Sequence, residues 1–99
     1  MDHAALEKTV IGQLEKVIDP ETGVNVIRMK LVQNMRFDEN NMIFYEFRPS
    51  SPLCPIAVPL VLDIIHAIRA IHEITGQSVK VVDYIQADEL NKMLESVSR

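Results

Sequence analysis

Apolar side chains recur at helical spacing near the start of the chain, and polar residues fill the positions between them. The apolar positions are Leu6, Val10, Leu14 and Val17. This spacing predicts an amphipathic helix over residues 3–18. We expect the helix to end at "DPETG", because Pro20 disfavours helical backbone at Asp19 and Gly23 permits a positive φ. The following "VNVI" (24–27) predicts a short extended segment.

Two segments then alternate between apolar and polar residues with the period of a strand. In residues 31–37 one face carries Leu31, Met35 and Phe37, and in residues 42–48 one face carries Ile43, Tyr45 and Phe47. The intervening "DENN" has the side chains that bond locally to backbone and tolerate left-handed φ. The pattern predicts an antiparallel β-hairpin.

The second half of the chain predicts a long helix over 56–75, a strand over 79–85 and a final helix over 87–97. Gly76 suits the position just after the long helix. The fold class that follows is α/β (α+β), with the order α-β-β-β-α-β-α. We expect a two-layer sandwich: a small, mostly antiparallel or mixed sheet with helices on one face. Residues 1–99 are expected to form a single domain.

Composition narrows the classes of function. The 99 residues are 47% hydrophobic and 24% charged, with a net charge of −4, which is typical of a globular protein. This acidic balance, without a basic patch, argues against a nucleic-acid partner. No apolar run is long enough for a membrane span, and the first residues lack the apolar core of a signal peptide. A single cysteine cannot form an internal disulfide, so we expect a cytoplasmic protein without membrane attachment.

The candidate chemistry gathers in "RPSSPLCPIAVPLV" (48–61), which holds the cysteine and four of the five prolines. Pro55 favours the first helical position, which would place Cys54 near the helix N-cap. Backbone N–H groups and the helix dipole would then lower the pKa of the thiol from its free value of about 8.5. Pro59 suggests an irregular first turn. The alternative is a buried structural cysteine, since free cysteines are among the most buried residues.

Other polar groups have weaker signals. Asp19 and Glu21 of "DPETG" can act as ligands, hydrogen-bond acceptors or a base, although turn formation alone also explains them. Ser50 and Ser51 offer hydroxyl groups shortly before the cysteine. His66 and His72 are six residues apart, about 240° around a helix, so they cannot share a metal ion from one face.

Two separated motifs resemble those of the SufT/PaaD-like family of metal–sulfur cluster biosynthesis proteins. These are "VIDPETGVNVIRMKLV" and, after the hairpin, "SSPLCPIAVPLVLDIIHAI". The resemblance covers about residues 6–85. It implies a role in iron–sulfur cluster assembly or targeting, with Asp19, Glu21, Ser50, Ser51 and Pro55 supporting a cluster contact at Cys54.

The resemblance also implies an adaptor or transient carrier without catalytic residues. Its partners would be iron–sulfur assembly proteins or client apoproteins, and its cargo a transient iron–sulfur cluster. One cysteine per chain cannot supply the roughly four ligands that a cluster needs, so stable holding would require a homodimer or a partner's thiols. Two alternatives stay open: a thiol-dependent enzyme that uses Cys54, and a plain protein-interaction module with a structural cysteine.

Overall fold

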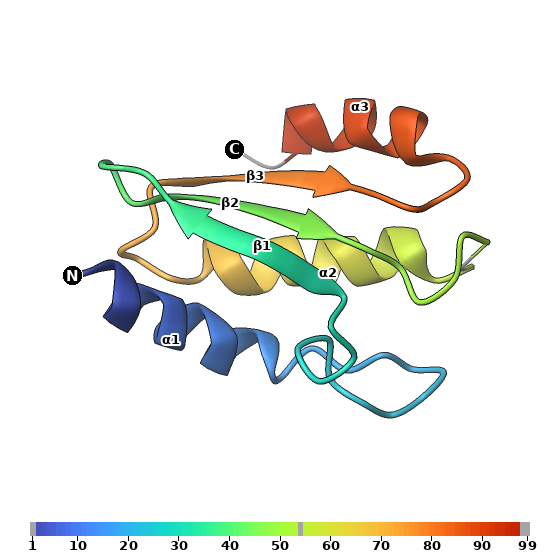
Figure 1. Ribbon diagram of the computed structural model, residues 1–99, viewed down its shortest axis with the longest axis horizontal. Coiled ribbons are helices and arrows are strands. Elements are labelled where there is room, and N and C mark those ends of the chain that lie inside the picture. Colours follow the sequence, from blue (N-terminus) through green and yellow to red (C-terminus); the bar gives the residue numbers. More distant parts are fainter. Residues whose placement is uncertain (1, 54, 98–99) are drawn as a thin grey trace.

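A computed structural model describes residues 2–53 and 55–97. Three helices and one three-stranded sheet make up the fold (Figure 1). In chain order they are α1 (His3–Leu14), β1 (Val32–Phe37), β2 (Met42–Phe47), α2 (Ala57–Arg69), β3 (Gly76–Val81) and α3 (Ala87–Val97). The predicted α+β class is confirmed.

The sheet is mixed and has the order β1-β2-β3. β1 and β2 form the predicted antiparallel hairpin, closed by Asp38, whose carboxylate accepts from the N–H groups of Asn40 and Met42 at 2.9 Å each. β2 and β3 are parallel, paired from Met42–Gly76 to Phe47–Val81. A bulge interrupts β1 between Gln33 and Arg36, where Asn34 has a φ of 53°. The parallel pair places the carboxyl ends of β2 and β3 at one edge of the molecule.

The core lies between the sheet and the two helices α1 and α2 (Figure 1). Alternate residues of β2 point into it, namely Ile43, Tyr45 and Phe47. They meet the buried faces of α1 (Leu6, Val10, Leu14) and α2 (Leu60, Val61, Ile64, Ile65, Ile68). α3 lies along β3, where the Asn91 side chain accepts from the Val81 N–H at 2.7 Å and donates to the Val81 carbonyl at 3.1 Å. α3 thus pairs with the outer edge of the sheet.

Several predicted elements differ from those in the structure. The first helix ends at Leu14 rather than 18, because the next turns tighten through bonds from Lys16 N to Gln13 O and from Val17 N to Leu14 O. Val17 is buried although it lies beyond the helix, so an apolar residue at helical spacing made the predicted helix too long. No strand forms over 24–27. A single antiparallel bridge joins Ile18 to Asn25, and turns follow, so the order is α-β-β-α-β-α.

Further corrections concern the end of α2, Gly76 and the bounds of β3. The long helix ends at Arg69 rather than 75, and Ile71 and Ile74 belong to the connecting turns. Ile71 is buried outside the helix, which is why periodicity missed the boundary. Gly76 opens β3 and does not cap the helix. β3 spans 76–81 rather than 79–85, because pairing with β2 begins at Gly76 and Asp83, with a φ of 53°, follows its end.

Candidate functional site

The loops that follow β2 and β3 meet at the carboxyl edge of the parallel strand pair. Residues 48–56 lead from β2 into α2, and residues 82–86 lead from β3 into α3. The turn after α1 lies at the same end of the molecule, as does the N-terminus of α2 (Figure 1). In open sheets with parallel strands, ligand sites commonly lie at this edge. We call this end of the molecule the carboxyl edge.

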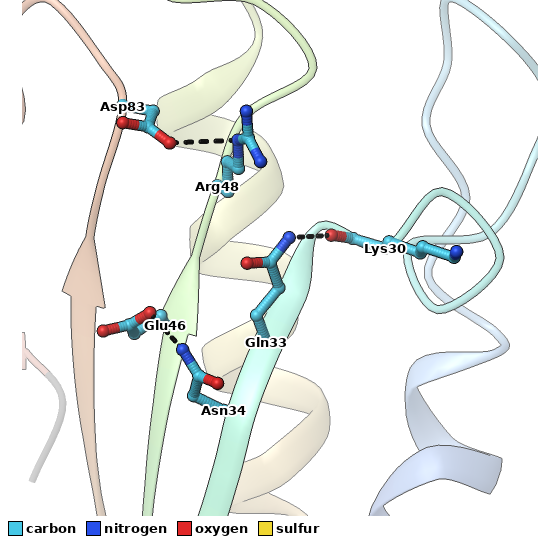
Figure 2. Close-up of polar contacts among 6 residues, drawn as sticks. All are labelled: Lys30, Gln33, Asn34, Glu46, Arg48 and Asp83. Atoms are coloured by element: carbon cyan, nitrogen blue, oxygen red, sulfur yellow. Dashed lines mark hydrogen bonds and ion pairs between the residues drawn. The ribbon is translucent and has the colours of Figure 1, made fainter.

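Direct contacts hold the two loops together. The Ile85 N–H donates to the Pro52 carbonyl at 2.9 Å, and the Val82 N–H donates to the Phe47 carbonyl at 3.0 Å. Figure 2 shows the ion pair between Arg48 Nε and the Asp83 carboxylate, 3.0 Å apart. Both side chains are more than half exposed, so the pair adds little stability, about 0–1 kcal/mol. Its main effect is to connect the two loops at their bases.

The same view shows the polar contacts that shape the adjoining strand β1 (Figure 2). The Asn34 amide donates to Glu46 Oε1 at 2.6 Å, and the Gln33 amide donates to the Lys30 carbonyl at 2.9 Å. Lys30 has a φ of 60° just before the strand begins. The Arg48 N–H donates to the Leu31 carbonyl at 2.8 Å. The start of β1 is therefore fixed against the first residue of the proline-rich loop.

The "DPETG" turn is built around the side chain of Asp19. This residue is only 1% exposed, and its Oδ1 accepts from the Glu21 N–H at 2.8 Å. Its backbone carbonyl accepts from the Gly23 N–H at 2.8 Å, with Gly23 at a φ of 71°. Burying a carboxylate costs free energy unless it is hydrogen-bonded. The bond from the Glu21 N–H to Asp19 Oδ1 therefore stabilises the conformation of the turn. Glu21, by contrast, lies exposed on the turn.

The proline-rich loop presents its polar groups to solvent. Ser50 and Ser51 are both exposed, and Ser51 Oγ accepts from the Leu53 N–H at 3.3 Å. Pro49 is buried and anchors the start of the loop. Ser51 therefore shapes the backbone just before Cys54. Cys54 itself lies outside the described residues.

The N-terminus of α2 follows two residues after the cysteine. The N-cap is Ile56, so the prediction that Pro55 occupies the first helical position is wrong. Pro55 is exposed and precedes the cap. Ile56 makes no side-chain capping bond, and the first turn contains no acidic residue. Pro59 is the third helical residue, where the N–H that proline lacks has no intrahelical partner, so the first turn is regular. The uncapped N–H groups favour negative charge.

The predicted site residues that the structure describes lie in segments at one end of the molecule. The described side chains there do not form a metal site. Asp19, Glu21, Ser50, Ser51 and Pro55 all belong to segments at the carboxyl edge (Figure 1). Within residues 2–53 and 55–97, no group of three or more His, Cys, Asp or Glu side chains could hold a metal ion. His66 and His72 lie on the last turn of α2 and beyond it, toward the opposite end.

Sequence reasoning missed three residues at this edge. Arg48 and Asp83 form the ion pair that joins the loops, and Ile85 is 69% exposed beside Pro52. The sequence placed Ile85 at the end of a strand, where an apolar residue is expected to be buried. The signal available was Asp83, since aspartate often marks the end of a strand.

The family model described as "Iron-sulfur cluster assembly protein" matches residues 7–81, which include both the "DPETG" turn and the proline-rich loop. The chain belongs to this family, and the resemblance to an iron–sulfur cluster assembly family is confirmed.

The chain is also similar to individual proteins. The chain is 31% identical over 78 residues to "Fe-S protein maturation auxiliary factor YitW" of Bacillus subtilis, covering 79% of this chain and 76% of the relative. It is 20% identical over 89 residues to the uncharacterized protein MJ1129 of Methanocaldococcus jannaschii, covering 90% and 94% of the two chains. A crystal structure of a domain of unknown function, DUF59, from Bacillus anthracis superposes with a TM-score of 0.73. Its sequence identity is 28%, with 95% and 94% of the chains covered.

Within the described part of the chain, no helix has the length and hydropathy needed to cross a membrane.

Proposed function

We propose that this protein is a maturation factor for iron–sulfur proteins that acts as an adaptor or transient carrier of clusters. The observation that carries the proposal is the family match, because it spans the "DPETG" turn and the proline-rich loop together. The name of the Bacillus subtilis relative, a maturation auxiliary factor, supports an accessory role rather than a catalytic one. The partners are iron–sulfur assembly proteins and client apoproteins.

In this proposal Cys54 is the residue that contacts the cluster. It stands two residues before the N-cap of α2, whose first turn has neither a side-chain cap nor an acidic residue. Such a helix end favours an anionic thiolate or sulfide. Thiolate is also the ligand that iron–sulfur clusters select. The cluster is cargo here, shared with ligands from a partner or from a second copy of the chain.

The other motif residues have supporting roles. Asp19 fixes the "DPETG" turn through its bond to the Glu21 N–H, and the exposed Glu21 carboxylate is free to face a partner. Ser51 shapes the loop backbone before the cysteine, and the exposed Ser50 hydroxyl is available as a donor to cargo or partner. Pro49 and Pro55 restrict the loop on either side. Each role concerns position and recognition, and none requires turnover.

The proposal is tested in cells of the source organism that lack the gene. We expect the activity of iron–sulfur enzymes to fall while the amounts of their polypeptides stay constant, and wild-type protein to restore it. Cys54→Ser is expected to fail in restoring activity, whereas Glu73→Gln, an exposed change beyond the far end of α2, should succeed. Unchanged enzyme activity in the deletion strain would refute the proposal. A turnover by the purified protein that disappears in Cys54→Ser would favour a thiol enzyme instead.

A further inference from the structure

Two large apolar residues are exposed on the adjoining loops of the carboxyl edge. Leu53 and Ile85 are each 69% exposed, more than any other large hydrophobic residue described. They come from different loops that are held together by the 2.9 Å bond from the Ile85 N–H to the Pro52 carbonyl. A single exposed leucine needs no explanation, but two on adjoining loops of a 99-residue domain do. We call this pair the Leu53–Ile85 patch.

The patch is fixed in place by its surroundings. The ion pair of Arg48 with Asp83 joins the bases of the two loops, and the Leu53 N–H donates to Ser51 Oγ at 3.3 Å. These contacts hold the loop backbone while the apolar side chains extend into solvent. A loop backbone that is held by such contacts loses less conformational entropy when a partner covers it. The arrangement is therefore suited to binding.

Negative charge borders the patch on one side. Asp88 and Glu89 occupy the first turn of α3, three and four residues after Ile85, and both are exposed. Among the described residues, the ion pair of Arg48 with Asp83 involves neither of these carboxylates. A partner that covers Ile85 would meet these two exposed carboxylates, whose charge the N-terminus of α3 only partly offsets. The patch thus favours a partner with lysine or arginine beside its apolar side chains.

We propose that the Leu53–Ile85 patch is the docking surface for the partner protein that gives or receives the cluster. The occupant is a segment that presents apolar side chains flanked by basic residues. This inference rests on the proposed function, because Leu53 immediately precedes Cys54 and a partner seated on it would meet the thiol. Apolar contact supplies the affinity, and the acidic border selects the partner and orients it.

The test uses a chemically defined probe and the full chain labelled with ¹⁵N. The probe is the synthetic peptide acetyl-KLKLKL-amide, compared with acetyl-KSKSKS-amide and acetyl-ELELEL-amide. We expect the first peptide to shift amide signals of residues 51–53 and 83–89, and the other two to bind about tenfold more weakly. Added salt should weaken binding of the first peptide, because the acidic border is exposed.

Matched variants assign the binding to this patch. Leu53→Ser, Ile85→Ser and the charge-neutral pair Asp88→Asn with Glu89→Gln should each raise the Kd about fivefold or more. Ala70→Ser and Glu73→Gln, exposed at the opposite end of α2, serve as controls and should leave it unchanged. Thermal unfolding checks that every variant is folded. If one serine variant unfolds, the other serine variant and the charge pair still give the answer.

Three results would overturn the proposal. In the first, the lysine–serine peptide binds as tightly as the lysine–leucine peptide. In the second, the shifted amide signals lie on the outer sheet face around Arg36 and Lys80. In the third, sedimentation would show a dimer that Leu53→Ser dissociates, and the occupant would then be a second copy. The titration requires neither a cluster nor a client, so a failure of docking is distinguishable from a failure of iron–sulfur enzyme maturation in the deletion strain.

Discussion

Asp19 and Glu21 are two residues apart in one turn, yet their environments differ completely. Asp19 is buried and its carboxylate accepts from the Glu21 N–H, whereas the Glu21 side chain is exposed. From the sequence, both residues are candidate acidic ligands. The fold shows that the Asp19 side chain stabilises the turn, whereas the Glu21 side chain is exposed to solvent. The sequence cannot show this because burial of Asp19 depends on how the turn packs after α1 ends.

The first prediction separates these two roles. Asp19→Ala should lower the free energy of unfolding by about 1–3 kcal/mol, because the Glu21 N–H loses its acceptor in a buried turn. Glu21→Gln should change stability by less than about 0.5 kcal/mol and still reduce enzyme maturation in cells. Asp19→Asn, which keeps an oxygen acceptor, is the matched control. Urea unfolding and the maturation assay are the measurements, and a Glu21→Gln variant with full maturation would leave that carboxylate with no role.

The second prediction concerns the thiol of Cys54. In the folded protein Cys54 should react with iodoacetamide with an apparent pKa below the free value of about 8.5, because it precedes the uncapped N-terminus of α2. The rate is measured against pH in the folded protein and in urea, where the helix dipole is absent. A thiol that reacts only after unfolding would support the alternative of a buried structural cysteine.

At the scale of elements, the hairpin and the last helix were predictable, and the ends of the other elements were not. Local chemistry determines the hairpin, since Asp38 and Asn41 close its turn whatever surrounds them. The ends of α1 and α2 were missed because Val17 and Ile71 are buried beyond the helices. The start of β3 was missed because its first residues pair with β2, a contact distant in sequence. The two motifs were identified, but the Arg48–Asp83 pair depends on that same parallel pairing.

A buried chain of hydrogen bonds connects two strand side chains to a backbone carbonyl of α2. The Tyr45 hydroxyl of β2 donates to Gln77 Oε1 of β3 at 2.8 Å, and the Gln77 amide donates to the Ile65 carbonyl of α2 at 3.0 Å. No buried side-chain polar atom in the described residues lacks a hydrogen-bond partner. Burial raises the pKa of the Tyr45 hydroxyl well above its ordinary value of 10.0, because the phenolate would lose its hydration.

The third prediction follows from this raised pKa. Tyr45→Phe should cost about 1–3 kcal/mol near pH 8, because Gln77 Oε1 loses its buried donor. Above about pH 10 the unfolded state releases the tyrosine proton while the folded state retains it, so the wild type loses stability with rising pH. Tyr45→Phe lacks this loss, and the difference between the two proteins should narrow. Urea unfolding from pH 8 to 11 measures the difference, and a constant gap would contradict the prediction.

At the scale of the whole molecule, the carboxyl edge combines a turn, a helix N-terminus and the loop whose sequence holds the one cysteine of the chain. An iron–sulfur cluster takes about four protein or equivalent ligands. The described residues contain no set of three further ligands that could complete the shell. We therefore expect a cluster held here to draw ligands from outside the chain. Ligands that exchange with solvent or a partner make a cluster labile. Lability suits transfer and is unsuited to a permanent redox centre.

The last prediction applies this ligand count. Under anaerobic reconstitution with iron, sulfide and a small thiol, we expect at most a weak, oxygen-sensitive cluster whose formation coincides with dimerisation. Its visible absorbance should be absent in Cys54→Ala, while His66→Ala, remote from the carboxyl edge, should behave as the wild type. Absorbance and sedimentation are recorded on the same samples. A stable cluster on a monomer would contradict the count. If no cluster forms while a client protein still binds, the carrier role is refuted and the adaptor role remains. Docking of a client depends on the surface of the carboxyl edge and does not require a bound cluster.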